Sequence, residues 1–428
     1  MISKVLRTIF LIFICFCSFS CSPHRNQFTI WIGGSPQEID YWQHVVDRFN
    51  RSTGSDLQLI RQPTYTDQRK QNLVVSLVAR QKDPDLFLMD VVWINQFARS
   101  GWLAPLDSFS VADTLNDNVF FPSVVNSVDR IDSTLFALPV FLDVALLYYR
   151  TDLLRKYGYE NPPETWDELT SMAETIQEGE RKRNAGFNGF VWQGAQYEGL
   201  VCSFLEFIAS HNGSLSKEGI FNAQSEYNAD ALQFMQNLIH RWKISPLSTF
   251  TEMKEEEVRR SFQSGNALFE RNWTYAWNLH QQDNSAVKGK VGICLLPHFK
   301  NGKSVSTMGG WHIGISKYSD RKKQAEAFIA FVTSFNEQKS MLMQVGWNPA
   351  RQDLYTDSAL LVQIPRLSIL REALLNAVAR PSLPYYGQIS EIIQRNVNDC
   401  LAGKATAGEA LKKIQEESET IQSMYGAQ

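Results

Sequence analysis

Segments typical of strands and segments typical of helices alternate along most of this chain, and this alternation limits the fold more than any other feature. Residues 28–32 are rich in β-forming types, residues 57–60 predict a second strand, and residues 86–89 form an unbroken apolar run. Such a run suits a strand that is buried on both faces. Apolar residues at helical spacing separate these strands. The pattern therefore predicts an α/β fold with a parallel sheet.

The same alternation continues toward the C-terminus. Residues 291–296 and 313–316 predict further strands. Two predicted helices begin with a capping box, in which a Thr and a Glu three residues later satisfy each other's backbone N–H groups. The pairs are Thr165 with Glu168 and Thr406 with Glu409. Because no repeat or long linker interrupts the pattern, we expect interwoven α/β lobes.

Composition narrows the classes of protein to which this chain could belong. A chain of 428 residues is long enough for about two or three domains, and it can bury a core without disulfides or metals. The formal net charge is −3, and Lys and Arg are scattered. This distribution argues against a nucleic-acid-binding surface. The 11 Trp residues are the first indication of carbohydrate binding.

The N-terminus resembles a targeting signal. Lys4 and Arg7 precede an apolar run at residues 9–19, which is too short to span a bilayer comfortably. The sequence SFSC at residues 18–21 resembles a lipoprotein processing site, although Ser18 stands where such sites usually carry Leu. We expect residues 1–21 to be a signal with Cys21 as the lipidated residue, and residues 22–27 to be a tether. An ordinary cleaved signal and an uncleaved anchor are the alternatives.

The three cysteines beyond the signal, Cys202, Cys294 and Cys400, lie in apolar segments. Buried free thiols are the expected state. Their odd number and the absence of a CxxC motif support neither a disulfide framework nor a zinc site. We predict no metal and no cofactor.

Enzyme signatures are absent from the sequence. It contains no GxSxG, no HExxH and no GxGxxG motif after a strand. Paired carboxylates for glycoside hydrolysis come together only in the fold, so a secreted glycosidase acting on α-glucosides stays open as an alternative. No catalytic residue is predicted.

Sugar binding needs carboxylate, amide or guanidinium groups for the hydroxyls and flat aromatic rings for the apolar faces. Asp90 and Asp143 each follow a predicted strand, at the end where ligands bind in open α/β sheets. Trp273 lies in a predicted loop, and Trp311 follows two glycines that permit close approach of the backbone. Structural roles are the alternatives: Asp90 as a helix cap, Trp311 in packing between lobes, and Arg380 in a surface ion pair.

Four stretches resemble the extracellular solute-binding proteins of family 1, and in particular the trehalose/maltose-binding proteins of ABC importers. They are DPDLFLMDV (83–91) with GWLAPLD (101–107), ALPVFLDVALLYYR (137–150) with PPETW (162–166), ERNW (270–273) with GGWHIGISK (309–317), and RP (380–381) with PYY (384–386). The resemblance covers roughly residues 28–425, and the order and spacing of the stretches make it specific.

The resemblance implies a periplasmic-binding-protein-like fold of type II. Two α/β lobes would be joined by a three-strand hinge, with the ligand cleft between them. The N-terminal lobe would comprise residues 28–141 and 297–345, and the C-terminal lobe residues 144–294 and 349–428. The hinge crossovers would lie near residues 141–144, 294–297 and 345–349.

The family pattern also implies a set of ligand contacts. These are Glu38, Thr64, Arg69, Asp90, Asp143, Trp273, Tyr275, Gly310, Trp311, Arg380 and Tyr386. Phe141 departs from the pattern, because relatives can carry Tyr there, and this loss of a hydroxyl puts the sugar preference in doubt. Residues 196–198 (QYE) lie in a matching segment and are second-rank candidates.

The implied function is binding without chemistry. A monomeric, lipid-anchored protein outside the cytoplasm would bind a disaccharide or small oligosaccharide of the trehalose/maltose type. It would deliver the sugar to the transmembrane subunits of an ABC permease. A surface adhesin or chemoreceptor ligand carrier is a third alternative.

Overall fold

The computed structural model describes residues 27–107, 119–217 and 220–426. The predicted signal, Cys21 and nearly all of the tether lie outside these residues. These described residues form two compact units, one within residues 27–87 and 315–328, the other within residues 88–314 and 329–426. These units differ in extent from the predicted lobes, and the lobe boundaries and hinge crossovers stay predictions.

The first unit begins with two strands and two helices in alternation. β1 (Thr29–Gly33) leads into α2 (Pro36–Thr53), and β2 (Gln58–Gln62) leads into α3 (Thr66–Val78). β1 pairs in parallel with β2 and with β3 (Leu86–Asp90). The strands predicted at residues 28–32, 57–60 and 86–89 are therefore confirmed. Ser35 caps α2 and forms a capping box with Glu38.

The larger sheet has six strands in the order β14-β6-β13-β3-β1-β2. β6 (Ala137–Asp143) pairs antiparallel with both β13 (Gly309–Ile315) and β14 (Asn348–Pro349). The prediction of a parallel sheet is therefore wrong for these strands. Strand–helix alternation sets the direction of consecutive strands such as β1 and β2, whereas the strands paired with β6 lie far from it in sequence.

A four-stranded sheet in the second unit has the order β12-β7-β11-β8. β7 (Ala145–Arg150) runs antiparallel to β11 (Ala267–Trp273) and to β12 (Val291–Cys294), and β11 runs parallel to β8 (Asn188–Val191). The strand predicted at residues 291–296 is thus confirmed for most of its length. β7 begins just after Asp143 and β11 ends at Trp273, and the family pattern implies both residues as ligand contacts.

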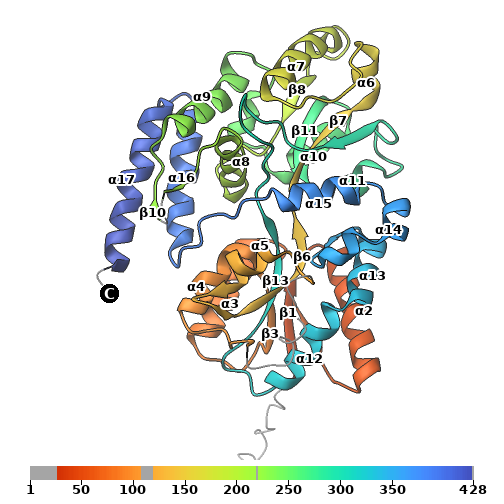
Figure 1. Cartoon of the computed structure of the whole chain (residues 1–428), viewed down its shortest axis with the longest axis vertical. Helices are drawn as coiled ribbons and strands as arrows, with labels where there is room; N and C mark the ends of the chain where they lie inside the picture. The colour runs from red at the N-terminus through yellow and green to blue at the C-terminus, as the bar shows by residue number, and fades with distance from the viewer. Residues whose placement is uncertain (1–26, 108–118, 218–219, 427–428) are drawn as a thin grey trace, which may run out of the picture. The chain divides into compact units, whose positions relative to one another are not determined.

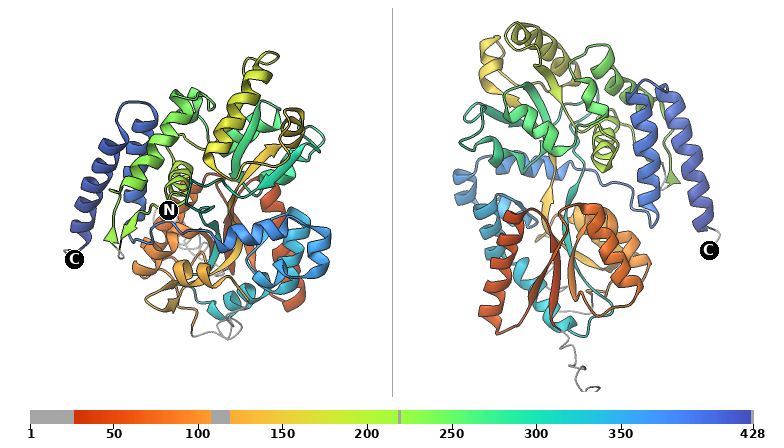
Figure 2. Two further views of the ribbon diagram at one scale, coloured as in Figure 1. Left: turned by 45° about the horizontal axis from the view of Figure 1, so that its top comes forward. Right: turned by 180° about the vertical axis from the view of Figure 1, so that it is seen from behind.

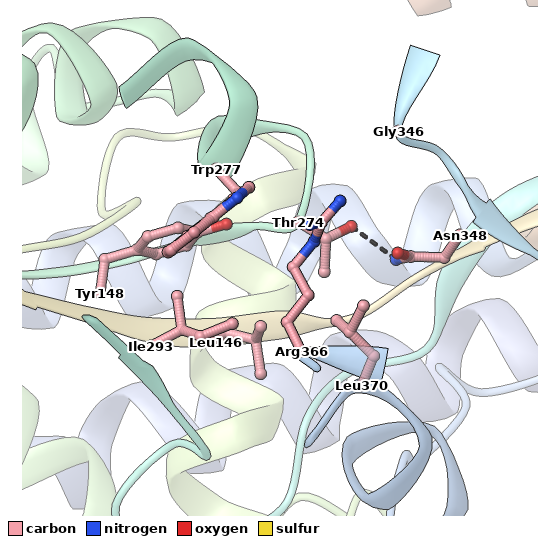
Figure 3. Close-up of a pocket in the computed structure, with 9 residues that line it drawn as sticks. All are labelled: Leu146, Tyr148, Thr274, Trp277, Ile293, Gly346, Asn348, Arg366 and Leu370. Atoms are coloured by element: carbon pink, nitrogen blue, oxygen red, sulfur yellow. Dashed lines mark hydrogen bonds between the residues drawn. The ribbon is translucent and has the colours of Figure 1, made fainter. Parts of the chain in front are cut away.

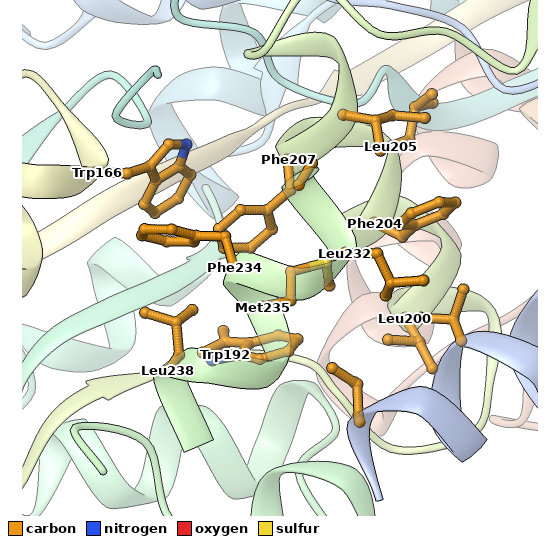
Figure 4. Close-up of a cluster of buried hydrophobic side chains, with 14 of the residues drawn as sticks. Trp166, Trp192, Leu200, Phe204, Leu205, Phe207, Leu232, Phe234, Met235 and Leu238 are labelled. Atoms are coloured by element: carbon orange, nitrogen blue, oxygen red, sulfur yellow. The ribbon is translucent and has the colours of Figure 1, made fainter. Parts of the chain in front are cut away.

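Helices of the second unit enclose a large aromatic core (Figure 4). Trp166, Trp192, Phe207 and Phe234 lie in it, and the rings of Trp166 and Phe207 stack at 4.2 Å. The helices that contribute most to this core are α7 (Trp166–Arg181), α8 (Glu198–Ala209), α9 (Glu226–His240) and α16 (Tyr386–Leu401). The capping box predicted at Thr165 is present at the start of α7.

α16 and α17 (Ala407–Gly426) lie side by side in Figures 1 and 2, and both contact α9. Thr406 and Glu409 bond to each other's backbone N–H groups, as the predicted capping box requires. The remaining helices and turns are η1 (Val91–Trp93), α4 (Ile94–Arg99), α5 (Pro122–Val124), η3 (Val125–Asp129), α6 (Thr151–Lys156), η4 (Leu247–Phe250), α10 (Glu255–Gln263), α11 (Ala276–His280), α12 (Lys322–Val332), α13 (Phe335–Val345), η5 (Gln352–Tyr355), α14 (Ser358–Gln363) and α15 (Leu367–Leu375). Two short antiparallel pairs join β4 (Arg130–Ile131) with β5 (Thr134–Leu135) and β9 (Ser216–Lys217) with β10 (Ile220–Phe221).

Cys202 and Cys400 are buried, Cys294 is partly buried, and all three are free thiols, as predicted. Burial raises the pKa of each to about 12, so these thiols are unreactive at neutral pH. Among the described helices, none is long and apolar enough to cross a membrane. The described residues also contain no cluster of His, Cys, Asp and Glu that could hold a metal ion.

Candidate functional site

Three of the predicted contact residues lie together in the first unit, where β1 and β2 end. We call Glu38, Thr64 and Arg69 the β1 group. Arg69 Nη1 donates to the carbonyl of Gly33 at 2.9 Å, and the Thr64 hydroxyl donates to that of Gly34 at 3.1 Å. A Cβ on Gly33 would lie 2.2 Å from Arg69 Cδ, so a side chain there would displace Arg69. Gly33 therefore leaves the space that the Arg69 side chain occupies.

Glu38 has a structural partner in this group. Its Oε2 accepts from the backbone N–H of Ser35 at 2.6 Å and completes the capping box of α2. Capping boxes satisfy N–H groups that the first turn of a helix leaves without partners. The sequence SPQE at residues 35–38 carried this signal, which the sequence analysis missed. A ligand that contacts Glu38 would contact a carboxylate already oriented by the helix start.

The other predicted contacts lie in the second unit, and we call them the tryptophan group. They are Asp90, Asp143, Trp273, Tyr275, Gly310, Trp311, Arg380 and Tyr386. Asp90 Oδ1 accepts from the N–H of Val92 at 3.1 Å and lies 3.5 Å from Arg380 Nη2. The alternative role of Asp90 as a helix cap is therefore confirmed. The cap and the ion pair use the same oxygen.

Arg380 and Tyr386 share one carboxylate, that of Glu198. Arg380 Nη1 donates to Glu198 Oε1 at 2.8 Å, and the Tyr386 hydroxyl donates to the same atom at 2.6 Å. Ser390 donates to the second oxygen. Because the Arg380 side chain is only 4 % exposed, the alternative of a surface ion pair is wrong. Glu198, which was only a second-rank candidate, is the residue that joins two predicted contacts.

Asp143 is the last residue of β6, and its carboxylate accepts hydrogen bonds from Thr274, the residue that follows β11. Its Oδ1 accepts from the Thr274 hydroxyl at 2.6 Å and from the Thr274 N–H at 3.1 Å. Asn348 donates to the same hydroxyl oxygen of Thr274 at 2.6 Å. Burial raises the pKa of Asp143 to about 6, although the Thr274 hydrogen bonds lower it in part. The Asp143 carboxyl group therefore loses its proton at a pH only slightly below neutral.

Trp273 rests on a buried cation. The Arg271 guanidinium lies 4.3 Å from the centre of the Trp273 ring, and it donates two hydrogen bonds to Glu206, one of them at 2.8 Å. Both charged side chains are at most 3 % exposed. Glu206 also accepts from the N–H of Thr307 at 3.0 Å. The sequence analysis missed Arg271 and Glu206; only the position of Arg271 beside Trp273 could have indicated a role.

A fully buried carboxylate–histidine pair accompanies each of the two tryptophans. Glu270, on the strand β11 that ends at Trp273, lies 2.7 Å from His280. Asp129 lies 2.6 Å from His312, the residue after Trp311. Burial raises the pKa of Asp129, and the adjacent His312 opposes this shift. These pairs fix the strands that present the indole rings.

Gly310 and the two remaining aromatic residues complete the tryptophan group. Gly310 has a φ of 142°, and a Cβ there would lie 2.6 Å from the Phe141 carbonyl, so no other residue fits without strain. Trp311 meets the edge of Trp93 with ring centres 5.7 Å apart. Tyr275 donates to Glu256 at 3.0 Å. Partly exposed indole rings beside carboxylate, guanidinium and hydroxyl groups are what a polyhydroxylated ligand needs.

Comparisons with known proteins identify the family of this chain. The family model described as bacterial extracellular solute-binding protein matches residues 34–339. A probable ABC transporter-binding protein of Deinococcus radiodurans is 35 % identical over 89 % of this chain and 90 % of its own length.

Solved structures show the same fold. The maltose-bound MalE3 of T. maritima is 37 % identical with a TM-score of 0.83, covering 92 % of this chain and 99 % of that one. A solute-binding protein of Thermotoga lettingae with bound α-D-tagatose is 27 % identical with a TM-score of 0.79, covering 92 % and 98 %. The predicted periplasmic-binding-protein-like fold of type II is thereby confirmed.

Proposed function

Because this chain belongs to the family of bacterial extracellular solute-binding proteins, we propose that it is the substrate-binding lipoprotein of an ABC sugar importer. Its ligand is a disaccharide or small oligosaccharide of the trehalose/maltose type. The observation that carries this proposal is the tryptophan group, in which Trp273 and Trp311 accompany Asp143 and the Glu198–Arg380–Tyr386 cluster. The maltose-bound MalE3 of T. maritima, similar to this chain over nearly its whole length, supports the choice of sugar.

In the proposed complex, the side chains of Asp90, Asp143, Arg69 and Arg380 hydrogen-bond the sugar hydroxyls. The faces of Trp273 and Trp311 cover the apolar faces of the rings. Glu38, Thr64, Tyr275, Gly310 and Tyr386 supply the remaining contacts. Contacts from both predicted lobes favour a closed state, since a ligand shifts a conformational equilibrium by its difference in affinity for the two states.

The closed, sugar-bound form then docks on the transmembrane subunits of the permease, and ATP hydrolysis there drives release. Lipidation of Cys21 holds the protein at the outer face of the cell membrane, as a monomer. The ligand is bound and released without chemical change.

One observation favours the rival function of an α-glucoside hydrolase. A carboxyl group with a pKa of about 6, such as that of Asp143, suits a general acid. In the proposed binding protein the same group accepts hydroxyl hydrogen bonds. Incubating the purified protein with maltose or trehalose and measuring released glucose separates the two functions, because a binding protein releases none.

The proposed ligand is tested by calorimetric titration of the purified protein with trehalose, maltose, glucose and sucrose. We expect one-to-one binding of a disaccharide, with glucose bound more weakly. Absence of heat with every α-glucoside would contradict the proposed sugar class. Titration would then move to other oligosaccharides, because Phe141 lacks the hydroxyl that relatives can carry at this position.

A further inference from the structure

A pocket in the second unit is lined in part by Thr274 (Figure 3). The hydroxyl of this residue also donates to Asp143, one of the proposed sugar contacts. The pocket has a volume of about 210 Å³, including space open to solvent. Its polar lining comes from Tyr148, Trp277, Asn348 and Arg366 as well as Thr274, and the rest is apolar or glycine. None of the four other polar residues belongs to the tryptophan group.

Arg366 carries a positive charge into this pocket without a counter-charge. Within the described residues its guanidinium has no hydrogen bond and no ion pair, and it lies over the face of Trp277, 5.9 Å from the ring centre. Burial lowers the pKa of Arg366 below its ordinary value, which shows that the charge is partly withdrawn from water. A withdrawn and unpaired charge costs free energy unless an opposite charge joins it.

The other polar groups of the lining are hydrogen-bond donors or already form hydrogen bonds with neighbouring residues. The Tyr148 hydroxyl donates to the Trp273 carbonyl at 2.9 Å, and the Thr274 hydroxyl donates to Asp143. Asn348 contributes an amide that bonds Thr274, and Trp277 contributes an indole N–H that has no partner within the described residues. In that part of the chain no carboxylate lines the pocket. A lining with one cation and no anion selects a negatively charged ligand.

We propose that this pocket binds a small inorganic anion of halide size, held by the Arg366 guanidinium beside the Trp277 indole and the Asn348 amide. The enclosed part of the pocket is too small for a sugar ring or a nucleotide, so the ligand is a small ion. Arg is the side chain best suited to this role, because its guanidinium stays charged and is more weakly hydrated than an ammonium group.

The position of the pocket gives the anion a structural consequence. Gly346 and Asn348 belong to the predicted crossover at residues 345–349, and Leu146 and Ile293 lie beside the other two predicted crossovers. A bound anion would therefore contact segments adjoining all three predicted hinge strands. The anion site itself is independent of the sugar, so it can be tested whether or not any sugar binds.

The direct test is a crystal of the unmodified protein grown in sodium bromide, with diffraction data collected at the bromine absorption edge. The proposal predicts an anomalous peak in contact with the Arg366 guanidinium and the Trp277 ring. A water molecule there, or bromide bound only elsewhere, would overturn it.

A solution test uses the linewidth of the chloride-35 NMR signal, which broadens when chloride exchanges with a protein site. We expect broadening by the unmodified protein that bromide reverses, and loss of most of this broadening in Arg366→Gln. Arg371→Gln is the matched control, because Arg371 is an exposed arginine on α15, the helix that begins directly after Arg366. Circular dichroism checks that both variants are folded. Equal broadening by Arg366→Gln and the unmodified protein would contradict the proposal.

Discussion

The β1 group and the tryptophan group are held in place by different means. In the β1 group, the partners of Thr64 and Arg69 are carbonyls and a hydroxyl near the ends of β1 and β2, and Glu38 caps its own helix. In the tryptophan group, the partners include charged side chains from distant parts of the chain. Arg380 bonds to Glu198, 182 residues away, and Trp273 lies over Arg271, which bonds to Glu206, 65 residues away. The β1 group is held by backbone carbonyls and a helix cap, whereas the tryptophan group also depends on ion pairs between side chains far apart in the sequence.

This difference has an energetic meaning. Local caps and carbonyl contacts each contribute about 1 kcal/mol, and water can replace part of what is lost. Removing one partner of a buried ion pair costs several times more, because the remaining charge stays in a medium of low polarity. The tryptophan group should therefore be stiffer and more sensitive to substitution than the β1 group.

The largest effect is expected from Glu206→Ala. It leaves Arg271 buried without a carboxylate and should lower the free energy of unfolding by about 3–5 kcal/mol. Urea unfolding of the purified variant measures this change. The matched control is Asp283→Ala, which removes the exposed ion pair with Lys288 and should change stability far less. Equal midpoints for Glu206→Ala and Asp283→Ala would show that the buried pair behind Trp273 contributes no more than an exposed one.

Asp90→Ala should weaken sugar binding roughly tenfold to a hundredfold, because a hydrogen bond to a charged group contributes about 1.5–3 kcal/mol. Calorimetric titration measures the change in affinity. Asp90 also caps η1, so Asp90→Ser is the informative companion, since Ser keeps the cap without the charge. If Asp90→Ser binds sugar as tightly as the unmodified protein, Asp90 acts only as a cap.

Asp143→Asn tests the buried carboxylate of the tryptophan group through pH. The pKa of Asp143 is raised from 3.8 to about 6, so its stabilising contribution is present below pH 3.8 and is lost as pH rises through about 6. Asn does not ionise, so the variant should gain stability relative to the unmodified protein between pH 4 and pH 8, by roughly 1–3 kcal/mol. Thermal unfolding across this range measures the gain. A difference in Tm that stays constant with pH would show that Asp143 is not perturbed.

The smallest effect is expected in the β1 group. Ser35→Ala removes the side-chain cap of α2 and should cost about 1 kcal/mol of stability. Glu38→Gln preserves a capping-box residue type and should cost less. Urea unfolding of both variants checks the order. A loss with Ser35→Ala as large as that with Glu206→Ala would mean that local caps matter as much as buried ion pairs.

The sequence predicted those parts of the molecule that depend on local patterns. The strands at residues 28–32 and 86–89 and the capping boxes at Thr165 and Thr406 follow from periodicity and capping, which act within a few residues. The antiparallel pairing of β6 with β13 was not predictable this way, because it joins segments separated by more than 150 residues.

The residues of the candidate site also fall into those that the sequence could predict and those that it could not. Trp273, Asp143 and Arg380 are recognisable as sugar-binding residue types in matching motifs. Glu206 was not recognisable, because it lies inside a helix whose other residues from 199 to 208 are nearly all apolar and buried. Only the fold brings this carboxylate to Arg271, and a single sequence offers no signal for such a pair.

The most direct test of the central claim is a crystal structure of the protein grown with the disaccharide that binds most tightly in calorimetry. The account predicts one sugar whose ring faces contact Trp273 and Trp311, and whose hydroxyls bond to Asp90, Asp143 and Arg380, with Arg69 of the β1 group contributing a further contact. A sugar bound away from both tryptophans, or no bound sugar at saturating concentration, would contradict it.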